Sequence, residues 1–151
     1  MPEPTYRQAD SNDADAIARV GTAVWEELAQ LSGLAGPLTA DGVRARMAEF
    51  GRRGAFFVCE DGRRACGFST VQPDVNHPTE AVLGVWLLAD ARGKGIGREL
   101  GVLGTTFARE AGYKRLRGII PEGNEPALSF FVVFATMAQM VGQGMEYELP
   151  L

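Results

Sequence analysis

A glycine-rich turn between an apolar segment and an amphipathic segment constrains the fold of this chain more than any other feature. The turn spans residues 92–97, after the apolar segment 81–89 and before the amphipathic segment 96–112. This order predicts a strand, a glycine turn and a helix. Glycines adopt positive φ without penalty, and the first N–H groups of a helix lack partners within it. The turn is therefore expected to bind a phosphate or diphosphate. Three cations lie on or beside it: Arg92, Lys94 and Arg98.

Three glycine codes for phosphate groups can be compared with this turn. The P-loop pattern G-x-x-x-x-G-K-[ST] does not occur in the chain. The dinucleotide pattern G-x-G-x-x-G begins at Gly93 and Gly95 but has Arg98 in place of its third glycine. The carboxylate expected about 20 positions later is also absent. The pattern R-x-x-G-x-G is complete, at Arg92, Gly95 and Gly97.

The complete pattern resembles the pyrophosphate loop of the GNAT superfamily of N-acetyltransferases, which bind acetyl-CoA. A second family pattern, N-x-x-A-x-x-[FLY]-Y, matches at Asn124, Ala127 and Phe130 and departs at Phe131, where Tyr is usual. The resemblance covers roughly residues 5–149. It implies a single acetyltransferase domain over residues 1–151 with an α+β, GNAT-type fold. Its mixed central sheet would have about six to seven strands, flanked by about four helices.

The resemblance also implies a binding site for acetyl-CoA as co-substrate. In the family the central strand separates from its neighbour just before the glycine turn, and the pantetheine arm pairs with the exposed amides. The N–H of Leu87 or Leu88 would then stabilise the oxyanion that forms during transfer. The implied cofactor-binding residues are Trp86, Leu87, Leu88, Ala89, Arg92, Gly93, Lys94, Gly95, Ile96, Gly97, Arg98, Asn124 and Phe131.

The acid and base of the reaction are less clearly marked. Family members often use a Glu of the central strand as base, but here the nearest carboxylates are Glu80 at the start of that strand and Glu60 at a hairpin end. Glu80 is the candidate base, and His77 is another because its pKa lies near neutrality. Phe131 has no proton to donate, so Tyr147 on the last expected strand is the candidate acid. A solvated or packed structural role is the alternative for each.

The acceptor is expected to bind at the first two helices and at their connection, residues 30–38. Trp25 with Glu26 and Glu27 suits a cation, because carboxylates and aromatic faces both attract positive charge. Amino acids, small amines, aminoglycosides and protein N-termini all remain open as acceptors.

The implied function is transfer of an acetyl group from acetyl-CoA to a primary amine, by direct attack in a ternary complex. Three alternatives stay open: a non-catalytic acyl-CoA-binding or regulatory module on the same fold, a nucleotide-binding α/β domain, and a longer acyl chain. No metal is expected, because two cysteines and one histidine fall short of a structural zinc set.

Charge and composition limit the partners. A net charge of −4 argues against nucleic-acid binding, which needs a basic face. Residues 1–4 lack the features of a signal peptide, so a cytoplasmic location is expected. Residues 126–145 carry no charge, but Pro126 and several polar residues favour a buried helix, a turn and a strand over a membrane span. Part of this segment could form a subunit interface, and a homodimer is expected.

Periodicity predicts the remaining elements. A short strand over residues 6–9 precedes a helix that starts at residues 11–13, and Thr39 is expected to cap a second helix. Segment 55–59 is apolar without alternation, which predicts a strand buried on both faces. The last strand is expected at residues 145–149. The apolar stripes of the two helices consist of Ile17, Val20, Val24, Leu28 and Leu31, and of Val43, Met47 and Phe50.

Two further patterns concern small residues. The pair Asp61-Gly62 predicts a two-residue hairpin turn that places Cys59 opposite Arg64 and Phe57 opposite Cys66. The cysteines would then be diagonal neighbours and buried, without a disulfide. Gly97, Gly101, Gly104 and Ala108 share one face of the expected helix, so this face is expected to meet something that leaves no room for a side chain. The CoA diphosphate arm is a candidate near Gly97, and close packing on the sheet is favoured for Gly101 and Gly104.

Overall fold

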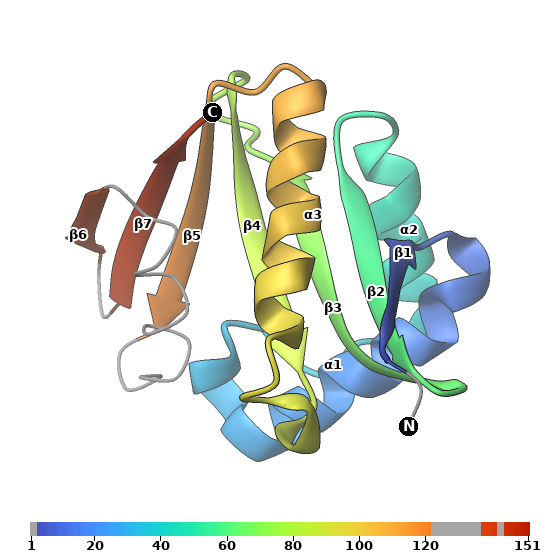
Figure 1. Ribbon diagram of the computed structural model, residues 1–151. Helices are drawn as coiled ribbons and strands as arrows, with labels where there is room; N and C mark the ends of the chain where they lie inside the picture. The colour runs from blue at the N-terminus through green and yellow to red at the C-terminus, as the bar shows by residue number, and fades with distance from the viewer. Residues whose placement is uncertain (1–2, 122–136, 142–143) are drawn as a thin grey trace.

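The computed structural model describes residues 3–121, 137–141 and 144–151. These residues form one mixed sheet in the order β1-β2-β3-β4-β5-β7-β6 (Figure 1). Only β4 and β5 pair in parallel among the described strands. The strands are β1 (Thr5–Gln8), β2 (Ala55–Asp61), β3 (Arg64–Pro73), β4 (Glu80–Leu87), β5 (Arg115–Pro121), β6 (Met137–Val141) and β7 (Gly144–Pro150).

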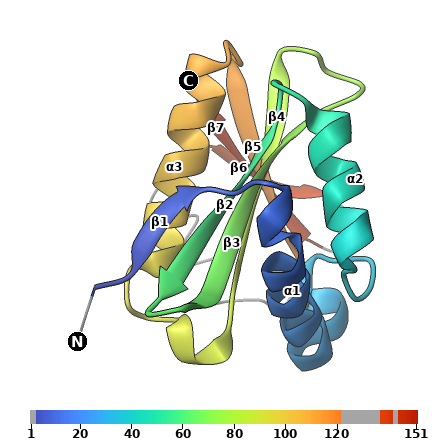
Figure 2. The same cartoon turned by 90° about the vertical axis from the view of Figure 1, so that its right-hand side faces the viewer.

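Helices cover both faces of the sheet. The described α-helices are α1 (Ala14–Leu28), α2 (Ala40–Phe50) and α3 (Ile96–Glu110), with short 3-10 turns at Ser11–Asp13, Ala29–Ser32 and Ala89–Ala91. Figure 2 shows α3 on one face and α1 with α2 on the other. This confirms the expected α+β architecture, with β6 as a strand that periodicity did not predict. The helix expected around Ala127–Phe131 lies outside the described residues.

The two helices of the α1/α2 face begin as expected. Asp10 accepts a hydrogen bond from the N–H of Asn12 and forms a capping box with Asp13, just before α1. Thr39 accepts one from the N–H of Gly42 and caps α2. Leu31, expected to continue the apolar stripe of α1, is 38 % exposed because the chain leaves the α-helix at Leu28. Among the described residues, no helix has the length and apolar character needed to cross a membrane.

The predicted register of the β2–β3 hairpin is wrong. Asp61 lies opposite Arg64, so the turn is Gly62-Arg63, with Gly62 at φ +73°. A bulge between Glu60, which pairs with Ala65, and Cys59 then shifts the strands by one residue. Sequence alone did not reveal the shift, because it depends on how the two strands meet rather than on the turn residues.

The bulge changes how the two cysteines meet. Cys59 lies opposite Gly67, and Phe57 lies opposite Ser69 instead of Cys66. Both cysteines are free and buried as expected, but their sulfurs are only 3.4 Å apart. Burial raises the pKa of the Cys59 thiol to about 12, so it stays protonated and packs as a small apolar side chain.

The small-residue face of α3 packs on the sheet, as expected. Gly97, Gly101 and Gly104 are buried. A Cβ at Gly104 would lie 2.7 Å from Leu83 Cδ1, so a larger residue there would push the helix away from the sheet. The glycines therefore let α3 lie close to β3 and β4, and this fixes the position of its first turn.

Candidate functional site

The central strand β4 is paired on both edges only in its first part. It pairs with β3 over residues 81–87, but with β5 only from Glu80 to Val82, opposite Arg115 to Arg117. Beyond Val82 the two parallel strands separate, and Figure 1 shows β5 turning away from β4 towards the end at which α3 begins. The last five residues of β4, 83–87, therefore have an edge without a strand partner in the described structure.

The direction of the amides decides which ones face this open edge. Leu88 donates its N–H to the carbonyl of Cys66 on β3, at 2.9 Å. Successive N–H groups of a strand point to opposite edges. The N–H groups of Leu83, Val85 and Leu87 therefore point towards the gap between β4 and β5. Of the two amides predicted to stabilise an oxyanion, Leu87 has the right direction, and Leu88 is used within the sheet.

The glycine turn leads directly from this edge into α3. Gly93 and Gly95 have φ of +76° and +83°, a backbone region that side chains disfavour. Gly95 is the N-cap of α3, and no side chain caps the first amides of this 15-residue helix. Lys94 and Arg98 are exposed beside it, without an ion pair to any residue that the structure describes. The free amides, the helix dipole and two cations together form a site for an anion.

Arg92 forms an ion pair that the sequence did not predict, and its expected role in cofactor binding stays a prediction. Its guanidinium forms two hydrogen bonds with the Glu27 carboxylate, at 2.7 and 2.8 Å, and a third with the carbonyl of Leu87 at 2.9 Å. This pairing lowers the pKa of Glu27. Arg92 thus joins α1, the end of β4 and the turn, while Lys94 and Arg98 supply the uncompensated charge. Sequence reasoning named both partners of the ion pair but did not connect them, because 65 positions separate them.

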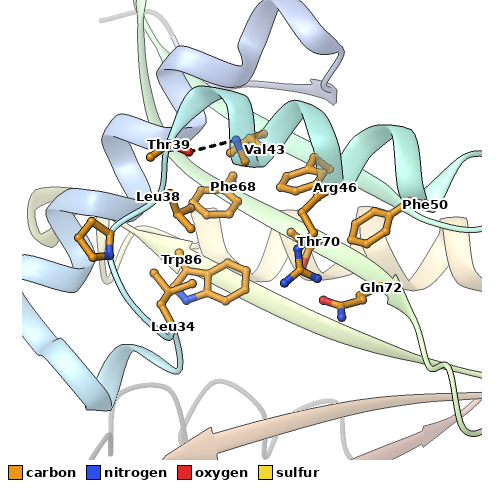
Figure 3. A pocket seen from close by; sticks show the side chains of 13 residues that line it. Leu34, Leu38, Thr39, Val43, Arg46, Phe50, Phe68, Thr70, Gln72 and Trp86 are labelled. Atoms are coloured by element: carbon orange, nitrogen blue, oxygen red, sulfur yellow. Dashed lines mark hydrogen bonds between the residues drawn. The ribbon is translucent and has the colours of Figure 1, made fainter.

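The side chain of Trp86 lies on the α1/α2 face, next to a pocket. Its ring stacks on Phe68 with centroids 5.0 Å apart, and its Nε1–H donates to the carbonyl of Ser32 at 2.8 Å. The pocket, of about 250 Å³, is lined by α2, by the connection between α1 and α2, and by β2, β3 and β4 (Figure 3). Sequence analysis expected an acceptor at this connection. It did not identify the stacked rings of Phe50, Phe56, Phe68 and Trp86 that line the pocket, because these residues come from separate elements.

Glu80 and His77 lie at the other end of β4. Leu87 lies seven positions after Glu80, about 23 Å along an extended strand. The Nδ1 of His77 lies 3.3 Å from Asp74 Oδ2 and 3.8 Å from Glu80 Oε2. Arg117 completes this group, through an ion pair with Asp74 and a distance of 4.0 Å from its Nε to Glu80 Oε1. The structure therefore does not bring either candidate base to the open edge.

The structure describes only some of the other residues predicted to take part in catalysis or cofactor binding. Glu60, the other carboxylate considered, is held by Arg7 of β1 at 2.8 Å. The backbone of Tyr147 on β7 is paired with Gly118, the first residue of β5 beyond the part that pairs with β4. Asn124 and Phe131 lie outside the described residues, so their roles stay predictions.

The arrangement excludes one of the alternatives. Nucleotide-binding α/β domains use parallel sheets, whereas here only β4 and β5 are parallel among the described strands. An open strand edge that leads into an anion-binding turn instead suits a ligand with an extended polar arm and a diphosphate. Hydrogen bonds from the edge would hold the arm, and the turn would hold the diphosphate.

Comparisons with known proteins agree with this geometry. The family model described as the acetyltransferase (GNAT) family matches residues 21–134. An N-acetyltransferase from Staphylococcus aureus Mu50 aligns with a TM-score of 0.83 at 21 % identity, over 99 % of both chains. YncA from Salmonella typhimurium, a putative acetyltransferase solved with its cofactor acetyl-CoA, aligns with a TM-score of 0.83 at 17 % identity, over 98 % of this chain and 94 % of that one.

A third similar structure contains coenzyme A. The PaiA N-acetyltransferase from Thermoplasma acidophilum, in complex with coenzyme A, aligns with a TM-score of 0.81 at 13 % identity, over 99 % of this chain and all of that one. No curated protein matches the chain by sequence. At these identities the solved structures establish the fold, and the family model covers well over half of the residues. The chain belongs to the GNAT family of acetyltransferases.

Proposed function

We propose that this protein transfers an acetyl group from acetyl-CoA to a primary amine, by direct attack in a ternary complex. The observation that carries the proposal is the open edge of β4 at residues 83–87, followed through the 3-10 turn Ala89–Ala91 and the glycine turn by the uncapped start of α3. Solved GNAT structures with acetyl-CoA or coenzyme A support the choice of co-substrate.

In this proposal the chain binds acetyl-CoA with main-chain groups. The amides of the turn and of the first turn of α3 hold the diphosphate, and Lys94 and Arg98 add charge. The N–H groups of Val85 and Leu87 pair with the pantetheine arm and with the thioester carbonyl. A preorganised N–H at that oxygen stabilises the negative charge that develops as the amine attacks.

The transfer itself needs few side chains. The neutral amine attacks the thioester carbonyl carbon, the new C–N bond forms, and the C–S bond breaks with release of the CoA thiolate. The proton that the nitrogen loses passes to solvent water. A thiol with a pKa of about 8.5 leaves without strong assistance. The paired Glu27 is a weak base because Arg92 lowers its pKa. We leave Glu80 and His77 out of the mechanism, because the other end of β4 holds them.

Tyr147 is kept as the proposed donor to the leaving thiolate. Its position on β7, opposite the first residue of β5 beyond the paired part, supports the assignment. Tyr147→Phe should lower kcat and leave the affinity for acetyl-CoA unchanged. The cytoplasmic location and the homodimer stay predictions from the sequence.

The test is CoA release from acetyl-CoA with a panel of amino acids, small amines, aminoglycosides and peptides, together with acetyl-CoA binding by calorimetry. Release that depends on one acceptor class supports the transferase. Tight acetyl-CoA binding without release across the panel favours the non-catalytic binding module. Faster release from a longer acyl-CoA in the same assay would show that the transferred group is longer than acetyl.

A further inference from the structure

The pocket on the α1/α2 face has a continuous aromatic wall. Phe50 stacks on Phe56 with ring centroids 5.7 Å apart, Phe56 on Phe68 at 6.3 Å, and Phe68 on Trp86 at 5.0 Å. Three of these rings are almost fully buried, and Trp86 is half-buried. At about 250 Å³ the pocket is slightly smaller than typical small-molecule sites of about 300–1,000 Å³. Its shape and lining suit a flat apolar group.

Gly84 fixes the position of the aromatic wall at the end nearest the open edge. A Cβ at Gly84 would lie 2.1 Å from Cη2 of Trp86, so the indole covers the backbone of β4 at this point. The hydrogen bond from Nε1 to the carbonyl of Ser32 holds the ring there. Trp86 also lies directly before Leu87, whose N–H faces the gap. An acceptor resting on this indole therefore lies beside the proposed thioester site.

The charge of the pocket is positive. Arg46 is the only ionisable residue among the 13 that line it. In Figure 3 its side chain extends from α2 towards β3, beside Thr70 and Gln72. Within the described part of the chain, none of these three side chains forms a hydrogen bond or an ion pair. Arg44, two positions earlier, is instead paired with Asp15 and Asp41. One end of the pocket thus presents unused polar groups around a single cation.

These observations do not fit the cationic acceptor that the sequence suggested. Glu27 is occupied by Arg92, and none of the described residues that line the pocket is a carboxylate. A guanidinium with unused donors instead matches a carboxylate, which it can bind through two parallel hydrogen bonds. Thr70 lies opposite Gly84, and the gap lies on the other edge of β4. Leu87 lies three residues, about 10 Å, further along β4 than Gly84, and neighbouring strands are about 4.8 Å apart, so the anion and the reacting amine are separated by roughly 10–15 Å.

Building on the proposed acetyl transfer, we propose that the acceptor is a small apolar amino acid whose carboxylate and amine lie several bonds apart. Arg46 binds the carboxylate, Phe68 and Trp86 bind the apolar body, and the amine reaches the thioester beside Leu87. Arg46 is then a specificity residue: it touches the acceptor but not the reacting atoms.

The first test measures binding without turnover. We would titrate 3-phenylpropionate and its neutral amide into the protein and measure affinity by ligand-observed NMR. The carboxylate should bind about tenfold tighter than the amide. Arg46→Gln should remove this preference, while Arg44→Gln, on the same helix, should keep it. Equal binding of acid and amide, no binding of the acid at millimolar concentration, or an equal loss in both variants would overturn the proposal.

The second test measures transfer. The acceptors are 3-[4-(aminomethyl)phenyl]propionate, the corresponding propanamide, phenylalanine and a neutral dipeptide amide. The first should have the highest kcat/KM, and Arg46→Gln should raise its KM about tenfold with little change in kcat. A higher kcat/KM for the dipeptide amide or for phenylalanine would overturn the proposed acceptor. If no amine releases CoA, the proposed transferase activity fails, and the binding titration still decides the specificity of the pocket.

Discussion

The two ends of β4 are held in different ways. Its first residues pair with strands on both edges, and a group of charged side chains surrounds them: Asp74, His77, Glu80 and Arg117. The side chains of Asp74, Glu80 and Arg117 are only 11–15 % exposed. Its last residues have one open edge, the glycine turn, and an apolar pocket on one face.

This difference bears on where the proposed chemistry takes place. Carboxylates and histidines are common catalytic residues. In this chain, Asp74, His77 and Glu80 lie instead at the end of β4 where β3, β4 and β5 pair with one another. The end that carries the proposed reaction offers main-chain N–H groups, with Lys94 and Arg98 beside them, instead. Changes at the first end should therefore alter stability, and changes at the second end should alter binding.

The largest expected effect lies at the charged end. Arg117→Ala leaves the Asp74 carboxylate mostly buried beside Glu80 without its cation, which should lower the free energy of unfolding by about 3 kcal/mol. Denaturant unfolding measures this change. Arg63→Ala, in the exposed turn between β2 and β3, is the control and should stay within about 0.5 kcal/mol of the wild type. A large loss of acetyl-CoA affinity in folded Arg117→Ala would contradict the division between the two ends.

The next effect lies in the glycine turn. Gly95→Val forces a β-branched side chain to φ +83°, and the strain should reduce acetyl-CoA affinity by about 2 kcal/mol, or roughly 30-fold. Gly62→Val imposes similar strain at φ +73° in the β2–β3 turn, away from the site. This control should lose stability but keep the wild-type affinity in calorimetry. Equal affinity loss in both variants would mean that the turn has no special role.

A smaller effect is expected where α1 meets the turn. Glu27→Gln removes one charge of the pair with Arg92, which should cost about 0.5 kcal/mol of stability because both side chains are partly exposed. Glu26→Gln, at the neighbouring exposed position, should be neutral in the same unfolding experiment. If the two variants are equally stable, the ion pair between Glu27 and Arg92 adds nothing to the free energy of unfolding.

The smallest effect is a dependence on pH. The pKa of Glu27 is lowered in the folded chain, so the unfolded chain binds more protons in acid. The stability contributed by this pair is present above the ordinary glutamate pKa of about 4.5 and is lost as the pH falls through the lower folded value. Unfolding curves from neutral pH to pH ~3 should fall less steeply for Glu27→Gln than for Glu26→Gln. Parallel curves would contradict a lowered pKa of Glu27 in the folded chain.

Local signals in the sequence were enough to predict much of this structure. Thr39 caps α2, and Gly93 and Gly95 adopt the positive φ expected of the turn. These features depend on residues a few positions apart, which propensity and periodicity describe well. The separation of β4 from β5 was expected only from the resemblance to the family, because no short stretch of the sequence indicates it.

Contacts between distant segments were not predictable in the same way. The bulge beside Cys59 depends on how β2 and β3 pack, and it shifts the pairing from Cys59 onward by one residue. The pair between Glu27 and Arg92 joins a helix to a turn that lies far along the chain. The aromatic wall comes from α2, β2, β3 and β4, and only the folded chain brings these rings together.

The position of Trp86 gives the protein an optical reporter of its own. The chain has two tryptophans, and Trp86 lies between the pocket and the open edge of β4. In a Trp25→Phe background all indole fluorescence would come from this one ring, which stacks on Phe68 and donates to Ser32. Ligands on either side of β4 would change its surroundings differently, so a single emission spectrum could follow the order in which the two substrates bind.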